Sequence, residues 1–355
     1  MKVIREAIPV KEEAAVAVDL KYTRHGPVLF EDPKHNKAYA LRAAWMEIGC
    51  APYLASLRMD QAKTWEEFRD ACSYSRIPAE NMIWADRSKN IGYQAVGISP
   101  IRPGWSGLVP VPGDGRYEWD GYLPIKALPS MFNPAQGYIR TANNYMVPDG
   151  YPYAEALHFT WGDEMRAVRI DEVLGSGRMF MVTDMMRLQH DELSVPARNL
   201  VPFLRDLAVA DPETQKARDL LLSWDYLLDK DSVAAAIYVA WEGRLRSRVR
   251  DMTVPENARQ FLGGINLKRL IDWISAPDGR FGDDPVAARA ALLARCLEEA
   301  VAELQKKLGS DPGKWQYGQN RYKHALIRHP LSAAVNATLR ARLDAGPLPR
   351  VLPIS

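Results

Sequence analysis

The most informative stretch of the sequence is Gly137-Tyr-Ile-Arg-Thr-Ala-Asn-Asn-Tyr145. Its β-prone residues Tyr138, Ile139 and Thr141 predict a short strand that stops at two amide side chains, Asn143 and Asn144. Amides that packing holds at the end of a strand are good fixed hydrogen-bond donors. The alternative is an ordinary turn, in which asparagine is common.

The composition is that of a globular protein whose positive and negative charges nearly balance. The chain has 355 residues, of which 47% are hydrophobic and 25% charged, and its formal net charge is +2. A charge so close to zero argues against nucleic acid or an acidic membrane surface as the main partner. No run approaches the ~20 apolar residues that a membrane span needs. The first residues lack the apolar segment of a secretory signal, so the protein is either cytoplasmic or begins upstream of Met1.

Cysteine and histidine spacing predicts no metal or redox centre. The cysteines Cys50, Cys72 and Cys296 are far apart, without a C-x-x-C pair, and we expect buried thiols. His324 and His329 lie five positions apart, which fits a structural role better than a ligand pair.

The first half of the chain predicts antiparallel β structure. Alternating apolar residues and turn signals mark the segments 14–22, 23–30, 38–42, 81–86 and 91–97, the last two as a hairpin. Thr64 and Glu67 form a capping box before a helix with Trp65, Phe68 and Cys72 on one face. Residues 99–134 are rich in Pro and Gly and predict a long packed loop that walls a cleft.

The second half predicts helices. They are expected at 164–174, 184–207, 214–229, 232–251, 267–274 and 285–308. Pro196 should break or kink the second of these. The arginines Arg244, Arg246, Arg248 and Arg250 wrap around their helix, which favours a solvated face over a nucleic-acid track. The expected organisation is a β-rich part at 1–174, a helical part at 175–343 and an end segment at 344–355.

The local motifs of an autonomous hydrolase are absent. The sequence has no G-x-S-x-G elbow, no S-x-x-K, no H-E-x-x-H and no Walker loop. The nearest serine context, Gly104-Trp-Ser-Gly107, reads as an ordinary turn.

Taken together and in order, the motifs resemble the penicillin acylase (penicillin amidase) family of N-terminal-nucleophile hydrolases. The matching pieces are Thr23-Arg-His-Gly-Pro-Val28, Trp65-Glu-Glu-Phe68, Ala85-Asp86, Asn90-Ile-Gly-Tyr93, Leu108-Val-Pro-Val-Pro-Gly113, Glu118-Trp-Asp-Gly-Tyr-Leu-Pro124, Asn133-Pro134, Gly137-Tyr-Ile139, Ala142-Asn-Asn144, Trp161, Arg166-Ala-Val-Arg-Ile170, Gln189-His-Asp191, Trp224-Asp225, Trp315 and His329-Pro-Leu331. Each is weak alone, but their order and spacing are specific and cover nearly the whole chain.

The resemblance implies an α+β fold: part of an N-terminal-nucleophile-hydrolase αββα sandwich with a large helical insertion. In such proteins a precursor cuts itself to expose an N-terminal Ser, whose α-amino group is the general base, with an unperturbed pKa near ~8. We expect this chain to be an internal segment of the β chain, with the nucleophile, the α chain and the first β segment upstream of Met1.

The resemblance also implies roles for three residues. Asn143 matches the side-chain donor to the oxyanion, and Arg166 matches an arginine that orients that asparagine. Arg166 could instead pair with Asp163 or Asp171. Glu155 aligns with a carboxylate that helps to bind Ca²⁺ in some members. No organic cofactor is implied, and His25 looks structural.

The implied function is hydrolysis of a linear amide, of a β-lactam or another N-acyl compound, through an acyl-Ser intermediate. Family resemblance implies a periplasmic or secreted enzyme made as a zymogen, with a role such as antibiotic metabolism and no membrane or nucleic-acid partner. One alternative is a non-catalytic binding or scaffold protein that retains the hydrolase shell. A second is a cytoplasmic α/β binding module unrelated to the family.

Overall fold

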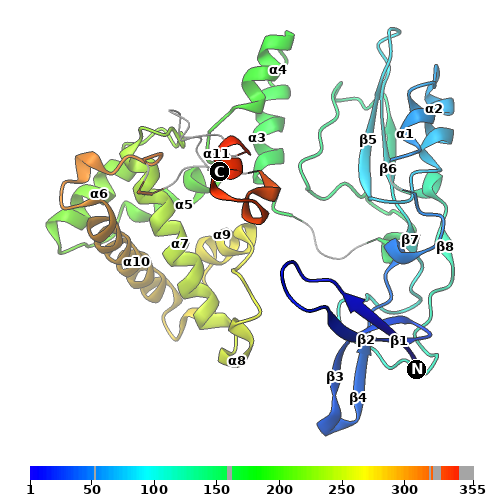
Figure 1. Ribbon diagram of the computed structural model, residues 1–355. Helices are drawn as coiled ribbons and strands as arrows, with labels where there is room; N and C mark the ends of the chain where they lie inside the picture. Colours follow the sequence, from blue (N-terminus) through cyan, green and yellow to red (C-terminus); the bar gives the residue numbers. More distant parts are fainter. Residues whose placement is uncertain (52, 158–161, 320, 323–328, 344–355) are drawn as a thin grey trace. The chain divides into compact units, whose positions relative to one another are not determined.

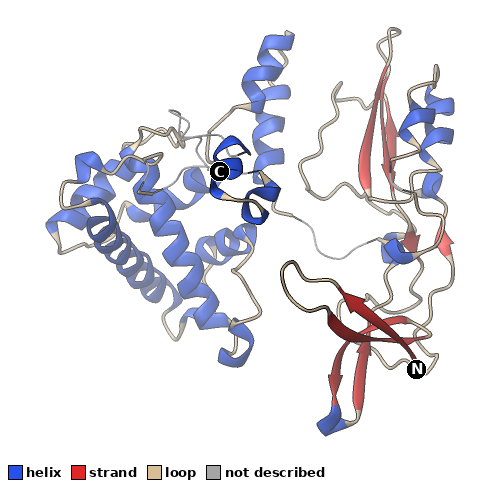
Figure 2. Ribbon diagram, viewed as in Figure 1, coloured by secondary structure: helices blue, strands red, loops and turns tan. Residues whose placement is uncertain are grey.

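The chain divides into two compact units, Met1–Trp161 and Gly162–Ser355. The computed structural model describes residues 1–51, 53–157, 162–319, 321–322 and 329–343. Strands are confined to the first unit among these residues, and most of the helices belong to the second (Figures 1 and 2). The two units are described separately. Within the described residues, no helix is long and apolar enough to cross a bilayer.

The first sheet is an antiparallel meander of four strands in the order β1-β2-β3-β4. Its strands are β1 (Lys2–Ile8), β2 (Val16–Thr23), β3 (Gly26–Asp32) and β4 (Lys37–Ala40). The prediction of antiparallel strands between 14 and 42 is confirmed, and β1 adds a strand that was not predicted. Gly26, the first residue of β3, has φ +131°, and a Cβ there would lie 2.0 Å from the carbonyl oxygen of Leu41. Only glycine fits this close approach of two backbones.

A second sheet contains the predicted hairpin and one unpredicted strand. β5 (Glu80–Ala85) and β6 (Ile91–Val96) pair antiparallel, and β9 (Ser130–Phe132) joins the other edge of β6. Two short strands, β7 (Ser99–Pro100) and β8 (Tyr122–Leu123), pair within the 99–134 segment. That segment also holds the 3₁₀ turn η3 (Ile125–Ala127).

The helix α2 (Trp65–Cys72) covers this sheet with the predicted face. Thr64 Oγ1 caps it by accepting from the backbone N–H of Glu67 at 3.2 Å. Trp65 stacks on Phe68 and on Phe132 of β9, with centroid distances of 5.9 and 5.4 Å. Trp65, Phe68 and Cys72 are all buried in one hydrophobic cluster, together with residues of the preceding helix α1 (Ser56–Met59).

The second unit is helical. Its helices are α3 (Met165–Leu174), α4 (Val182–Gln189), α5 (Val195–Leu200), α6 (Pro212–Leu222), α7 (Val233–Thr253), α8 (Glu256–Arg259), α9 (Leu267–Ser275), α10 (Pro285–Leu308) and α11 (Ala337–Leu343). α7 and α10 lie side by side (Figure 1) and supply much of its core. Trp241 of α7 is fully buried, and its indole N–H donates to the carbonyl of Leu293 in α10 at 3.2 Å.

Three sequence expectations differ from the structure. Residues 138–141 do not form a strand, because left-handed backbone at Gly137 (φ +76°) and Asn143 (φ +61°) bends the chain on both sides of this short run. The predicted helix 184–207 is two helices, α4 and α5, followed by a 3₁₀ turn. Ser194 caps α5, and Pro196 lies in its first turn, where no backbone N–H is needed. The predicted helix 214–229 ends earlier, since α6 stops at Leu222.

Candidate functional site

The two amides at the end of the 137–145 stretch have different environments. Asn143 is exposed and adopts left-handed backbone, with φ +61°. Asparagine tolerates that conformation better than most residues. Asn144 is 3% exposed, so its amide is buried. One residue therefore presents its side chain at the surface, and the other belongs to the interior of the same turn.

Asn144 holds the turn together. Its Oδ1 accepts from the backbone N–H of Ala142 at 3.0 Å, and its Nδ2 donates to the carbonyl of Tyr145 at 2.9 Å. Nδ2 also lies 3.2 Å from the sulfur of Met146. These bonds satisfy the buried amide and fix the backbone on both sides of Asn143. The arrangement suits a donor that must stay in one place while charge develops nearby.

A buried polar network anchors the segments around this turn. Gln94 of β6 is fully buried; its Oε1 accepts from Arg69 Nε at 2.8 Å, and its Nε2 donates to the carbonyl of Ile125 at 3.0 Å. Arg69 Nη2 donates to the carbonyl of Lys126, so α2, β6 and η3 are joined. The Tyr151 hydroxyl then donates to the carbonyl of Ala127 at 2.7 Å, which ties the segment after Asn143 to η3.

Asn133 links two of the motif pieces. Its Oδ1 accepts from the backbone N–H of Ile91 at 2.9 Å, and its Nδ2 donates to Oδ1 of Asn90 at 2.8 Å. Asn90 is itself bound to the carboxylate of Asp86 through its backbone N–H and its side chain. The Asp86, Asn90 and Asn133 motifs thus form one structural clamp between the β5–β6 turn and β9.

Glu118 joins the first sheet to the long loop. Its Oε1 accepts from His25 Nε2 at 2.8 Å and from Arg24 Nη2 at 2.9 Å, and its Oε2 accepts from Arg42 Nη1 at 2.9 Å. These three contacts, led by the hydrogen bond from His25, lower the pKa of the Glu118 carboxyl. The contacts of His25 agree with the structural role expected for it.

Arg166 is the second residue of α3, in the second unit, and its side chain is exposed. Asp163, one of its expected alternative partners, accepts from the backbone N–H of Met165 at 3.1 Å. Asn143 belongs to the first unit, so the orientation of Asn143 by Arg166 stays a prediction.

α3 is anchored by two ion pairs that the sequence did not predict. Arg169 binds Asp191 with both arms of its guanidinium fork, at 3.0 and 2.7 Å. Glu172 accepts from Arg198 of α5. The pKa values of Asp191 and Glu172 are lowered, in each case first by the hydrogen bond from the arginine. Arg169 and Asp191 both lie in pieces of the sequence that match the family motifs. This was the sequence signal that could have pointed to the two residues.

The other candidate residues from the sequence form neither a metal site nor a nucleophilic site with the residues that the structure describes. Glu155 lies in the 3₁₀ turn η4 (Ala154–Ala156), and its side chain is outside the described part. No group of three His, Cys, Asp or Glu side chains is placed to hold a metal within 1–51, 53–157, 162–319 and the short described segments beyond. His324 and the end segment 344–355 are outside the described residues, and His329 Nδ1 accepts from the N–H of Leu331.

The cysteines and the arginine run are as expected. All three cysteines are buried and free, and burial raises the pKa of the Cys72 and Cys296 thiols to about 12. Arg244 and Arg248 pair with Glu303 and Glu299 of α10. Thiolate chemistry and a nucleic-acid track are therefore disfavoured.

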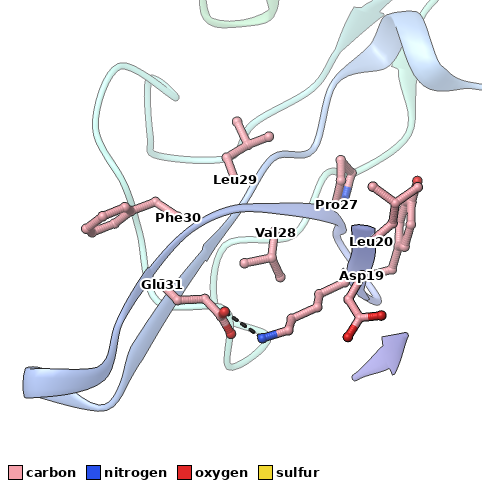
Figure 3. A pocket seen from close by; sticks show the side chains of 9 residues that line it. Asp19, Leu20, Pro27, Val28, Leu29, Phe30 and Glu31 are labelled. Atoms are coloured by element: carbon pink, nitrogen blue, oxygen red, sulfur yellow. Dashed lines mark hydrogen bonds and ion pairs between the residues drawn. The ribbon is translucent and has the colours of Figure 1, made fainter. Parts of the chain in front are cut away.

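A groove of about 390 Å³ lies between β2 and β3 (Figure 3). Its charged groups are already paired: Lys21 binds Glu31 at 2.6 Å, and Asp19 binds Arg5 at 3.2 Å. It is lined by Asp19, Leu20, Lys21, Tyr22, Pro27, Val28, Leu29, Phe30 and Glu31. Because its acids and bases neutralise one another, the groove offers no reactive group, and the turn at Asn143 is the better candidate site.

Comparisons with known proteins identify a matching family and similar acylases. The sequence model of the family described as penicillin amidase matches residues 1–351. An acyl-homoserine lactone acylase of Pseudomonas aeruginosa is 29% identical over 97% of this chain and 46% of its own length. A penicillin acylase 2 proenzyme of a Pseudomonas species is 32% identical, over 93% of this chain and 42% of its own length.

A solved structure also matches. The thermostable penicillin G acylase of Alcaligenes faecalis superposes with a TM-score of 0.71 and 26% identity, over 89% of this chain and 62% of that one. This match confirms the predicted α+β, N-terminal-nucleophile-hydrolase fold class. The chain spans less than half the length of the acyl-homoserine lactone acylase and of the penicillin acylase 2 proenzyme.

Proposed function

The chain belongs to the penicillin amidase family, and from that premise we propose that it is part of an amidohydrolase that cleaves linear amide C–N bonds. The observation that supports this most directly is the exposed Asn143 amide, on a turn fixed by the buried Asn144. An immobile amide donor is the element that acyl transfer needs at the carbonyl oxygen.

In the proposed reaction a serine outside these 355 residues attacks the amide carbonyl. Its own α-amino group takes the hydroxyl proton, and Asn143 Nδ2 donates to the oxyanion of the tetrahedral intermediate. The α-ammonium group then gives this proton to the amide nitrogen, and collapse releases the amine H₂N-R′ and leaves an acyl-Ser ester. Water then hydrolyses the ester, so that R-CO-NH-R′ and water give R-COOH and the amine.

Arg166 is proposed to orient the Asn143 amide through its guanidinium fork. Glu155 is proposed to supply one carboxylate to a Ca²⁺ site, a ligand type that suits this hard cation. The steps above use only the serine, its α-amino group and Asn143. The mechanism requires no organic cofactor.

The proposal extends to partners and compartment. The substrate is a small amide, a β-lactam or another N-acyl compound, in line with relatives that are named as an acyl-homoserine lactone acylase and a penicillin acylase. An α chain and an N-terminal β segment would complete the enzyme, which would be made as a zymogen and act in the periplasm or outside the cell. Antibiotic metabolism is one role consistent with this chemistry.

The test is to express the longest open reading frame that contains these residues and to follow its cleavage by mass spectrometry. Phenylacetyl and fatty-acyl chromogenic amides are then assayed with the product and with the 355-residue chain alone. We expect turnover only with the processed long form. Turnover by the 355-residue chain, or an inactive long form without an exposed serine, would instead support a different nucleophile or a non-catalytic scaffold.

A further inference from the structure

A second site is indicated by an arginine that has no counter-charge among the described residues. Arg102 lies in the turn Arg102–Gly107 of the long loop and is half-buried. Its Nη1 is sealed from solvent and has no hydrogen-bond partner, and no ion pair joins its side chain to any residue that the structure describes. A sealed guanidinium N–H without an acceptor is costly, so such groups are normally paired.

The same turn holds a second sealed donor. The indole N–H of Trp105 is also buried, and it has no hydrogen-bond partner in the part of the chain that the structure describes. The Trp105 ring packs edge-to-face on Tyr117, with the centroids 6.0 Å apart, so this side of the loop is aromatic. Guanidinium and indole groups only donate hydrogen bonds. Two unsatisfied donors in one short turn therefore call for an acceptor, and the positive charge calls for an anion.

The backbone is built to accommodate the guanidinium. Gly107 has φ +75°, and a Cβ there would lie 3.1 Å from Nε of Arg102. Any larger residue would crowd the Arg102 side chain in this position. Arg116 of the same loop provides the contrast, because it is exposed and already paired with Asp114 at 2.7 Å. Burial lowers the pKa of Arg102, whereas Asp114 raises the pKa of Arg116.

We propose that the turn Arg102–Gly107 binds a carboxylate, held by the Arg102 guanidinium with the Trp105 N–H as an additional donor. A planar fork matches the two oxygens of a carboxylate. The aromatic surroundings favour a singly charged, weakly hydrated monocarboxylate over inorganic phosphate, because the dianion loses more hydration on entry. The carboxylate can come from a free organic acid or from an Asp or Glu elsewhere in a longer protein, and the two sources differ in whether a small acid binds to this chain alone.

The 355-residue chain tests this directly. Calorimetric titration with phenylacetate should show binding, and the neutral isostere phenylacetamide and inorganic phosphate should not bind. Arg102→Met should weaken phenylacetate binding by ~10–100-fold, the loss expected for a charge-assisted hydrogen bond. Trp105→Phe, which removes the N–H donor and part of the ring but keeps an aromatic side chain, should weaken it less. Arg116→Met is the matched control and should bind as the wild type does.

Thermal unfolding without ligand separates a ligand site from a structural ion pair. If the partner is an external acid, Arg102→Met removes an uncompensated charge, and its Tm should equal or exceed that of the wild type. A Tm clearly below that of Arg116→Met, or failure to fold, would overturn the proposal. So would unchanged phenylacetate binding in Arg102→Met. Absence of phenylacetate binding to the wild-type chain would also overturn the binding of a free acid at this turn.

Discussion

At the scale of single residues, the neighbouring amides Asn143 and Asn144 have separable tasks. Asn143→Ala changes an exposed residue, so it should cost less stability than Asn144→Ala, while turnover of the processed full-length protein falls by ~10²–10³-fold, the usual loss for an oxyanion donor. The measurement is kcat/KM for a chromogenic amide beside Tm for each variant.

Asn144→Ala is the matched control at the adjacent position. It deletes a buried amide with three contacts and leaves two backbone groups unsatisfied, so it should destabilise the protein by ~1–3 kcal/mol. A variant Asn143→Ala with near wild-type turnover, or one as unstable as Asn144→Ala, would remove the oxyanion assignment.

Glu118 makes stability depend on pH. Its folded-state pKa lies below the unfolded value, so its contribution is fully present above the unfolded pKa of ~4.3 and is lost as the pH falls through the folded value. Glu118→Gln should therefore lower Tm at pH 7, and its difference from wild type should shrink as the pH falls from 5 to about 3.

The control for this pH series is Asp149→Asn, a change at an exposed carboxylate that forms no ion pair with the described residues. Its Tm should follow the wild type throughout. A Glu118→Gln difference that stays constant from pH 7 to pH 3 would mean that packing, rather than the charge of Glu118, stabilises the contact with Arg24, His25 and Arg42.

At the scale of elements, the packing of α2 on β6 depends on one glycine. A Cβ at Gly92 would lie 2.4 Å from the Trp65 ring, and that ring is itself stacked between Phe68 and Phe132. Gly92→Ala should therefore destabilise the first unit by ~1–3 kcal/mol through overpacking. Chemical denaturation measures this, and the double variant Gly92→Ala, Trp65→Leu should recover part of the loss. An unchanged stability would show that the ring moves freely.

Elements whose signals are local could be predicted from the sequence. The β5–β6 hairpin and α2 follow from alternation, a turn and a capping box, and all of these act within a few residues. The strand predicted at 138–141 was wrong. It was predicted from β-prone residues alone, whereas the left-handed backbone at Gly137 and Asn143 depends on the surrounding packing.

The candidate site could be predicted only in part from the sequence. Motif order pointed to Asn143, but nothing local indicated that Asn144 would be buried and hold the turn. The pairs Arg169–Asp191 and Glu118–His25 join residues far apart in sequence, and single-sequence patterns carry no information on such contacts. Gln94 offered a weak signal, since it is a polar residue in an otherwise buried strand.

At the scale of the whole molecule, each unit has its own hydrophobic core. The cluster around Trp65 and Phe68 draws its residues from the first unit, and the cluster around Trp241 and Leu297 draws from the second. Separate cores favour separate cooperative transitions, so each unit should have its own Tm, and the Tm values compared above for the Arg102, Arg116, Glu118 and Asp149 variants are those of the first unit.

This arrangement predicts that core mutations act on one unit at a time. Leu297 is fully buried in α10, so Leu297→Ala should destabilise the helical unit by ~2–5 kcal/mol and leave the transition of the β-rich unit unchanged. Phe68→Ala should produce the reverse pattern, with a loss of ~3–5 kcal/mol. Differential scanning calorimetry resolves the two transitions, and far-UV circular dichroism assigns the helical one. If either substitution shifts both transitions together, the two cores are coupled, and the 355 residues unfold as a single unit.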